Sequence, residues 1–360
     1  MSTPRTPVPP KPAPESSPEP TRTAYLVLGM HRSGTSAITQ LLSLAGAQLP
    51  KNVMPGDEHN AQGYFEPWRI AMFNDERLRA AGSAWDDVFA YPCPAVPDAE
   101  AAGWRARASA LFAEEYAGRR YPLMKDPRVT VLLPFWRETF DAAGVEARCV
   151  VPLRHPMAVA SSLGRRDGFA PQKSVLLWSA YMLAAEAHSR DLPRAFVDYD
   201  QLLGDWRSQV ARIERAHGGA LPKLGKAAER GIDAALTAEL RHNQAAGDLA
   251  GLGWTGEIAS SVYEWFAAAA RDEAPDHEPL DAAAAALAAR QRDIGPLVSP
   301  TARDFDRTRG ELLSARQSLA WDRRELEVLK ARFESLQRDW SSRKGAMDAT
   351  ERALDAALKG

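Results

Sequence analysis

Ala24-Tyr25-Leu26-Val27-Leu28-Gly29-Met30-His31-Arg32-Ser33-Gly34-Thr35-Ser36 is an apolar run that reaches a glycine and continues through a short polar loop. Consecutive apolar residues before a glycine are typical of a strand buried on both faces of a parallel sheet. Beyond the loop, apolar residues recur at helical spacing as far as Gly46, which predicts a helix that ends there. The stretch therefore predicts a strand, a tight turn and a helix N-terminus, an arrangement that binds anions.

The two glycines of this loop, Gly29 and Gly34, are spaced as in the phosphate-binding loop of nucleoside triphosphatases. Glycines at these places let several backbone N–H groups point at one phosphate. The lysine that normally follows the second glycine is replaced by Thr35, and the strong cation of the loop is Arg32. The sequence thus favours a phosphate site whose positive charge precedes the second glycine.

A second apolar segment, residues 147–153, leads into Arg154 and then into a helix expected to begin near Pro156. Ser162 follows eight residues after the arginine, within that helix. A guanidinium matches phosphate oxygens bidentately, and a serine hydroxyl adds a neutral hydrogen-bond donor. The alternative is that Arg154 only ends the strand and pairs with a carboxylate at the surface.

Taken together, these motifs resemble those of sulfotransferases that use 3′-phosphoadenosine 5′-phosphosulfate (PAPS). The segment 32–36 resembles their 5′-phosphosulfate loop, and Arg154 and Ser162 have the spacing of their 3′-phosphate ligands. The resemblance covers roughly residues 23–245 and implies transfer of a sulfuryl group from PAPS to a hydroxyl group, with no metal. It also implies contacts with PAPS by His31, Arg32, Ser33, Gly34, Thr35, Ser36, Arg154 and Ser162.

The same resemblance suggests which residues carry out catalysis. Sulfuryl transfer needs a base for the acceptor hydroxyl and cations for the charge that develops on the leaving phosphate, a role that Arg32 would fill. The acidic segment 57–67 resembles one found in many bacterial sulfotransferases, which makes Glu66 the first candidate for the base and Glu58 the second. The residues alone leave another possibility, in which Glu66 caps the N-terminus of a helix.

Residues 121–128, Tyr-Pro-Leu-Met-Lys-Asp-Pro-Arg, form a short apolar segment that breaks at a proline. Lys-Asp-Pro-Arg at this place recurs in bacterial and tyrosyl-protein sulfotransferase-like sequences. Lys125 would then neutralise charge on the sulfuryl group or on an acidic acceptor, and it ranks above Arg128 as a candidate. The alternative is that Lys125 and Asp126 belong to a solvated turn.

Four apolar segments, residues 24–29, 121–124, 147–153 and 195–198, alternate with amphipathic segments between residues 23 and 297. This alternation predicts an α/β fold in which a P-loop-like parallel sheet lies between two layers of helices. The long insertion between the first two strands is rich in tryptophan and could line an acceptor site or fill the core.

The two ends of the chain differ from this α/β domain. Residues 1–22 are rich in proline and predict a disordered tail. Residues 298–360 carry an apolar side chain at every seventh position, which predicts a helical coiled-coil extension; these are Phe305, Leu312, Leu319, Leu326, Phe333, Trp340, Met347 and Leu354. The positions three residues further on are mixed, so residues 305–357 could form a homodimer, bind a partner protein or lie along the α/β domain.

Composition limits the remaining possibilities. The chain has 360 residues and a formal net charge of −2, which gives no general attraction for nucleic acid. Its two cysteines, Cys93 and Cys149, are too few for a disulfide framework or a metal quartet. Neither a secretory signal nor an apolar run of membrane-spanning length occurs, so we expect a cytoplasmic protein.

Three functions remain open on sequence grounds. The favoured one is a PAPS-dependent sulfotransferase whose acceptor is a hydroxyl of a glycan, a polysaccharide or a lipid. A second is a nucleotide-dependent kinase with a P-loop, although the missing lysine after Gly34 disfavours it. A third is a coiled-coil assembly protein whose α/β domain is inactive.

Overall fold

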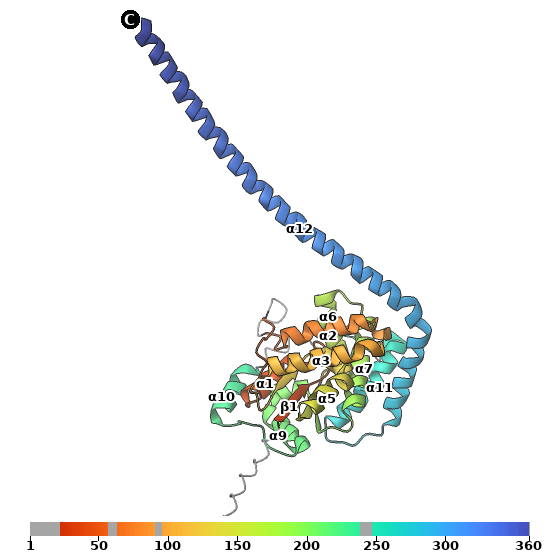
Figure 1. Ribbon diagram of the computed structural model, residues 1–360. Helices are drawn as coiled ribbons and strands as arrows, with labels where there is room; N and C mark the ends of the chain where they lie inside the picture. Colours follow the sequence, from red (N-terminus) through yellow and green to blue (C-terminus); the bar gives the residue numbers. More distant parts are fainter. Residues whose placement is uncertain (1–21, 57–62, 91–95, 238–246, 360) are drawn as a thin grey trace, which may run out of the picture. The chain divides into compact units, whose positions relative to one another are not determined.

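The computed structural model describes residues 22–56, 63–90, 96–237 and 247–359 (Figure 1). Contacts divide the chain into two compact units, one that ends at Ser299 and one that begins at Pro300. We describe each unit by itself. Residues 1–21 of the predicted tail and Glu58 lie outside the described residues, as does Cys93. The last residue of the predicted tail, Arg22, begins the first strand instead.

The first unit is built on a four-stranded parallel sheet with the strand order β2-β1-β3-β4. The strands are β1 (Arg22–Val27), β2 (Leu123–Lys125), β3 (Val145–Leu153) and β4 (Arg194–Asp198). In the central strand, Leu26 lies opposite Met124 on one side and Cys149 on the other. The predicted α/β fold with a parallel sheet is therefore confirmed.

Helices follow each strand and occupy most of the rest of the chain. They are α1 (Thr35–Leu44), α2 (Trp68–Ala80), α3 (Asp98–Glu115), α4 (Pro127–Val131), α5 (Leu133–Ala142), α6 (Pro156–Asp167), α7 (Pro171–Ser189), α8 (Tyr199–Gly204), α9 (Trp206–His217), α10 (Lys226–Ala235), α11 (Trp254–Ala269) and α12 (Glu278–Lys359).

Helices cover both faces of the sheet, and alternate residues of β1 belong to different layers. Tyr25 and Val27 pack with apolar side chains of α1, α8, α9 and α10. Ala24 and Leu26 belong to a larger core cluster that includes Trp136 of α5, side chains of α7 and Phe266 of α11. The sheet thus lies between two layers of helices, which keeps its carboxyl edge in a fixed position (Figure 1).

Several element boundaries differ from the prediction. The first strand ends at Val27 rather than residue 29, because Gly29 has a φ of 125° that leaves the extended region. Helix α1 ends as expected before Gly46, whose φ is 99°. The prediction that Glu66 caps a helix is wrong: Pro67 occupies the N-cap of α2, which starts at Trp68, and the Glu66 side chain is buried instead.

The second unit consists of the C-terminal part of α12, a single helix that begins at Glu278, before the predicted start of the helical extension. The eight apolar side chains of the heptad pattern, from Phe305 to Leu354, are each at least 51% exposed. Among the described residues, no helix combines the length and the apolar character needed to cross a bilayer.

Candidate active site

The topology of the sheet brings two chain segments together at its carboxyl edge. From β1, the chain passes to β2 on one side, and β3 and β4 lie on the other side. Open parallel sheets bind ligands at such a point, where the strand order reverses. The loop after β1, residues 28–34, and Arg154 directly after β3 both lie at this point, because β1 and β3 are neighbours.

The loop after β1 has an unusual backbone. Gly29, Arg32 and Gly34 have positive φ angles of 125°, 67° and 93°. The amide of Gly29 donates to Oγ1 of Thr130 over 2.8 Å, which fixes the start of the loop. Gly34 occupies the N-cap of α1 and supplies no side-chain hydrogen bond, so the helix dipole meets the loop without a capping group.

Gly34 is required because of its contact with Tyr199, the first residue of α8. A Cβ atom at position 34 would lie 2.4 Å from Cδ2 of Tyr199. The same ring lies under the guanidinium of Arg154, at 4.8 Å from the ring centroid to Cζ. The sequence did not single out Tyr199, although its place directly after β4, at the carboxyl edge of the sheet, is a signal that points to it.

Three residues that the sequence predicted for one site meet at the loop. Nε of Arg32 donates to Oγ of Ser162 over 2.7 Å. Nη1 of Arg154 donates to the carbonyl oxygen of Arg32 over 3.0 Å. We call the loop together with Arg154 and Ser162 the loop site; its residues come from the β1–α1 connection, the end of β3 and helix α6.

Positive charges crowd around the loop site. Burial lowers the pKa of Arg32, and the neighbouring Arg166 and Arg154 lower it further. Burial also lowers the pKa of Arg154; Tyr199 and Asp200 oppose this effect without reversing it, and Arg165 adds to it. The sequence did not single out Arg165 and Arg166 as site residues, although they are adjacent arginines in the last turn of the helix that carries Ser162. Cations that disfavour one another create a strong preference for an anion.

Two buried side chains of the loop lack a hydrogen-bond partner among the described residues, namely His31 through Nε2 and Ser33 through Oγ. Burial, followed by the nearby Arg166 and Arg128, holds the pKa of His31 well below its usual value, so the imidazole is neutral. Its ring meets Trp85 edge to face, with centroids 4.7 Å apart. Buried polar atoms are normally paired, so these two are atoms that a ligand could satisfy.

The remaining predicted contacts, Thr35 and Ser36, are the first two residues of α1, and Thr35 is buried. Of the tryptophans in the insertion, Trp85 lies against the loop through His31, as described above. Trp104 packs on Phe73 with centroids 5.4 Å apart, whereas Trp68 is exposed.

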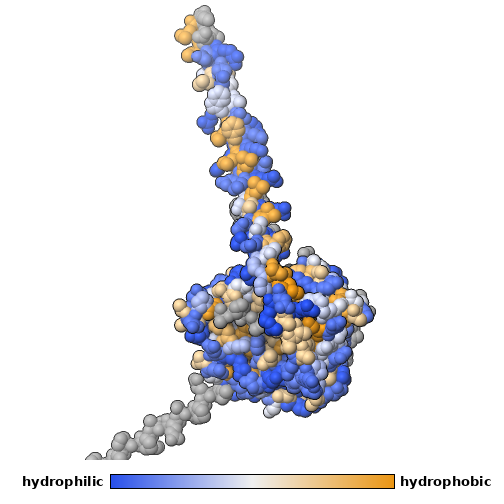
Figure 2. All heavy atoms as spheres, turned by 90° about the vertical axis from the view of Figure 1, so that its right-hand side faces the viewer, coloured by the Kyte–Doolittle hydropathy of each residue, from blue (hydrophilic) through white to orange (hydrophobic). Residues whose placement is uncertain are grey.

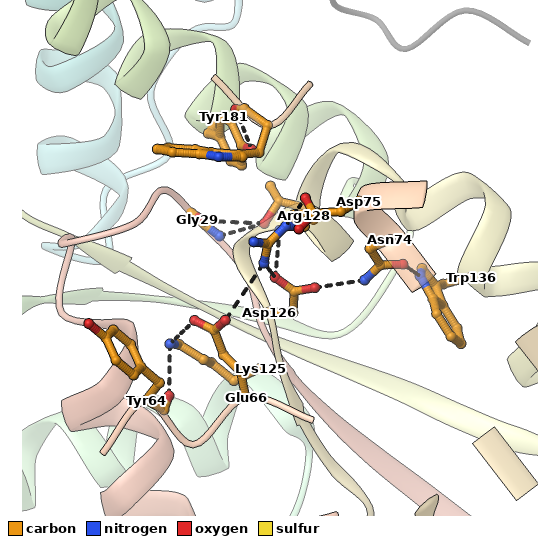
Figure 3. Close-up of polar contacts among 12 residues, drawn as sticks. Gly29, Tyr64, Glu66, Asn74, Asp75, Lys125, Asp126, Arg128, Trp136 and Tyr181 are labelled. Atoms are coloured by element: carbon orange, nitrogen blue, oxygen red, sulfur yellow. Dashed lines mark hydrogen bonds and ion pairs between the residues drawn. The ribbon is translucent and has the colours of Figure 1, made fainter. Parts of the chain in front are cut away.

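A second group of charged side chains begins at the end of β2 (Figure 3). We call Glu66, Asp75, Lys125, Asp126 and Arg128 the carboxylate cluster. Nζ of Lys125 donates to Oε1 of Glu66 over 2.7 Å and to the carbonyl oxygen of Tyr64 over 2.9 Å. The prediction of a solvated turn is wrong, because Lys125 is 3% exposed and Asp126 is fully buried.

Arg128 lies at the centre of the carboxylate cluster. Its Nε donates to Oδ1 of Asp75 over 2.6 Å, and its Nη1 lies 2.8 Å from Oδ1 of Asp126 and 3.7 Å from Oε2 of Glu66. Burial acts to lower the pKa of Arg128, but the three carboxylates outweigh burial and raise it. Arg128 therefore has more carboxylate partners in this cluster than Lys125, and the ranking of Lys125 above Arg128 as a functional candidate stays a prediction.

Asp126 connects the carboxylate cluster to the core. It accepts a hydrogen bond from the backbone N–H of Arg128, which caps α4, and another from Nδ2 of Asn74 over 2.7 Å. Oδ1 of Asn74 in turn accepts from Nε1 of Trp136 over 2.9 Å. Helix α4 also carries Thr130, which holds Gly29 of the loop site. The two groups of residues are thus joined through one short helix.

Within the described ranges, no group of three or more histidine, cysteine, aspartate or glutamate residues is arranged to hold a metal ion.

Comparison with known proteins gives matches among solved structures. No protein-family model matches the chain, and neither does any curated protein. The chain is similar to a sulfotransferase domain from the Synechococcus PCC 7002 olefin synthase, with 16% identity and a TM-score of 0.42 over 69% of this chain and 97% of that one. It is also similar to a sulfotransferase domain from the curacin biosynthetic pathway, with 15% identity and a TM-score of 0.36 over 67% and 96% of the two chains.

Proposed function

We propose that this protein is a PAPS-dependent sulfotransferase, which transfers the sulfuryl group of PAPS to a hydroxyl of an acceptor. The acceptor that we propose is a sugar of a glycan or polysaccharide, or a lipid. The observation that carries the proposal is the contact between Arg32 and Ser162 beside Arg154. It joins a loop suited to one phosphate with the two residues suited to another, as a nucleotide with both a 5′ and a 3′ phosphate requires.

The residues fit the two ends of such a nucleotide. Arg154 and Ser162 would hold the 3′-phosphate through a guanidinium and a hydroxyl. Residues 31–36 would hold the 5′-phosphosulfate, with the N-terminus of α1 behind it. The unpartnered Oγ of Ser33 and Nε2 of His31 support this assignment, because an anionic ligand and its hydroxyls would supply partners.

The reaction exchanges one sulfur–oxygen bond for another. The bond between sulfur and the phosphate oxygen of PAPS breaks, a bond between sulfur and the acceptor oxygen forms, and the acceptor hydroxyl loses a proton. Arg32 would stabilise the charge that develops on the departing phosphate. Glu66 would take the proton, while Lys125, at 2.7 Å, would hold its carboxylate in place.

Two features weigh against a kinase with the same loop. Phosphoryl transfer in P-loop enzymes depends on a lysine after the second glycine and on an aspartate that holds Mg²⁺. This chain has Thr35 at the first place, and Arg154 rather than a carboxylate follows β3.

We assign the sulfuryl transfer to residues 23–297 and association to residues 298–360, in a cytoplasmic protein that works where PAPS is made.

Calorimetric titration of the full chain with 3′-phosphoadenosine 5′-phosphate tests the proposal. We expect this product to bind more tightly than ATP with Mg²⁺, and Arg154→Ala to weaken its binding at least about 10-fold, a loss of about 1.4 kcal/mol. Arg137→Ala is the matched control, because Arg137 forms a partly exposed ion pair with Asp191 elsewhere. Tighter binding of ATP with Mg²⁺ would support a kinase, and binding of neither nucleotide would support an inactive domain.

A further inference from the structure

The second unit of the chain exposes a row of apolar side chains along α12, seen as separate hydrophobic patches in Figure 2. The eight residues of this row repeat every seven positions from Phe305 to Leu354, and each is between 51% and 67% exposed. We call this row the a column, after the first position of a heptad. A single helix in water gains little stability from its own hydrogen bonds and depends on burial of such a row. Something must therefore cover the a column.

Most of the charges beside the a column are sorted by sign. The positions directly before it, here the g column, contain one basic residue, Arg332, and four acidic residues, Asp304, Glu311, Glu325 and Asp339. The positions four residues after it, here the e column, contain one acidic residue, Glu351, and five basic residues, Arg309, Arg316, Arg323, Lys330 and Lys344. In coiled coils, the e and g residues form the ion pairs between helices that set partner choice and orientation.

Two parallel helices in register place each g residue opposite the e residue five positions later in the other copy. Four such pairs have opposite charges, namely Asp304 with Arg309, Glu311 with Arg316, Glu325 with Lys330 and Asp339 with Lys344. The four other pairs along the two columns contain at most one charged residue each. No pair brings like charges together, so a second copy of this helix would gain four attractive pairs between residues 304 and 344 and no repulsive one.

An antiparallel pair has the opposite electrostatics. There, e residues meet e residues and g residues meet g residues, so most bases face bases and most acids face acids, which opposes association. Some of these residues form ion pairs within their own helix, but these pairs are weak enough to be replaced by ion pairs between two helices. Asp304 with Arg307 and Lys330 with Glu327 are exposed pairs, and such pairs contribute about 0–1 kcal/mol.

We propose that residues 304–358 bind a second copy of themselves as a parallel, in-register, two-stranded coiled coil. The strongest part is the segment in which Leu326 and Phe333 of the a column alternate with Leu329 and Leu336, three residues further on. Asp322 and Arg343 occupy that same companion position in the heptads on either side and would face their own copies. Like charges at these places weaken the dimer on either side of its strongest part.

Charge reversal in the full chain tests the identity of the partner. One variant carries Arg309→Glu, Arg316→Glu, Lys330→Glu and Lys344→Glu; the other carries Asp304→Lys, Glu311→Lys, Glu325→Lys and Asp339→Lys. In analytical ultracentrifugation we expect the natural chain at twice its 39.4 kDa mass, each variant alone as a monomer, and an equal mixture of the two as a heterodimer. A monomeric natural chain would overturn the proposal in favour of a different partner. So would variants that dimerise alone.

Disulfide trapping tests the orientation. In a chain with Cys93→Ser, we expect Leu312→Cys, near one end of the a column, to cross-link to its own copy under mild oxidation. Ser314→Cys, on the outer face of the same heptad, is the matched control and should not cross-link. A dimer that Leu312→Cys fails to cross-link would be antiparallel, which contradicts the proposed arrangement.

Discussion

The loop site and the carboxylate cluster lie at neighbouring ends of β1 and β2, yet their positive charges have different surroundings. At the loop site, arginines lie close to other arginines, and the pKa of Arg32 is lowered by burial and by these neighbours. In the carboxylate cluster, three carboxylates surround Arg128 and raise its pKa despite its burial. Burial and like charges thus dominate at the loop site, where Asp200 only partly offsets them at Arg154, whereas the carboxylate cluster contains its own balancing negative charge.

This difference in charge suggests that the loop site binds an anionic ligand, whereas the carboxylate cluster stabilises the fold. A site whose cations repel one another gains free energy when an anionic ligand arrives, because the ligand supplies the missing charge. A buried cluster that is already neutralised gains nothing from such a ligand, and loss of one member leaves an uncompensated charge in the interior. We therefore expect substitutions in the loop site to affect ligand affinity most, and substitutions in the carboxylate cluster to affect stability most.

The largest effect should come from Gly34→Ala, which would change the loop site itself. The new Cβ would lie 2.4 Å from the ring of Tyr199, and the ring cannot move away without losing its contact with Arg154. The clash and the positive φ together should cost roughly 2–6 kcal/mol of stability and abolish binding of the bisphosphate. Thermal unfolding and calorimetry measure both quantities.

Gly103→Ala is the matched control for this substitution. Gly103 lies within α3, and a Cβ there would meet nothing within 4 Å. Alanine should therefore leave binding unchanged and raise stability by up to about 1 kcal/mol. Normal nucleotide binding by Gly34→Ala would show that the loop does not hold the ligand as proposed.

The next effect concerns Glu66 and separates its support of Lys125 from its proposed role as the base. Glu66→Ala should lower the free energy of unfolding by about 3–5 kcal/mol, because it leaves the buried Lys125 without its carboxylate. Glu66→Gln keeps an oxygen that can accept from Lys125 but cannot take a proton. We expect this variant to stay folded and to bind the bisphosphate normally while kcat falls at least about 100-fold.

Urea denaturation and initial-rate measurements on both Glu66 variants give these quantities. Glu114→Gln is the control, since Glu114 forms a partly exposed ion pair with Arg69. If Glu66→Gln retained its kcat, the base would be a different group, with Glu58 as the next candidate.

The smallest effect should appear in the pH dependence of stability and involves His31. Burial keeps this imidazole neutral in the folded protein, whereas the unfolded chain takes up a proton below a pH of about 6.5. The unfolded state then binds more protons, so the free energy of unfolding should fall as the pH drops from about 7 to 5. His31 contributes at most about 1.4 kcal/mol per pH unit to this fall.

Urea denaturation at both ends of that range should show a smaller fall for His31→Gln, which cannot titrate there. The variant keeps a residual slope from His155, His188 and His217, whose pKa values are also lowered by burial. An unchanged slope would mean that His31 does not stay neutral in the folded protein.

Local sequence patterns predicted the elements that depend on local chemistry. The apolar runs and the glycine pattern of the loop gave the parallel sheet, and helical periodicity gave α1 with its end before Gly46. The resemblance to sulfotransferases assigned Arg154 and Ser162 to one site with Arg32, and the three side chains do lie together, because β3 is the neighbour of β1.

Contacts between distant segments could not be predicted in this way. Glu66 lies 59 residues before its partner Lys125, and Asp75 lies 53 residues before Arg128, so no local period connects them. The sequence alone therefore treated Glu66 as a possible helix cap and Lys125 as a possible turn residue. Tyr199 was missed for the same reason, because its contact with Gly34 crosses the sheet edge.

The buried cysteine of β3 is shielded from chemical reagents as long as the sheet is intact. Cys149 lies fully buried in β3, paired with β1 on one side and β4 on the other, and burial raises the pKa of its thiol to about 12. A thiol reacts as the thiolate, so this cysteine is protected both by its surroundings and by its protonation. Alkylating reagents can reach it only when the middle of the sheet opens. The rate at which Cys149 is alkylated therefore reports how often this domain unfolds.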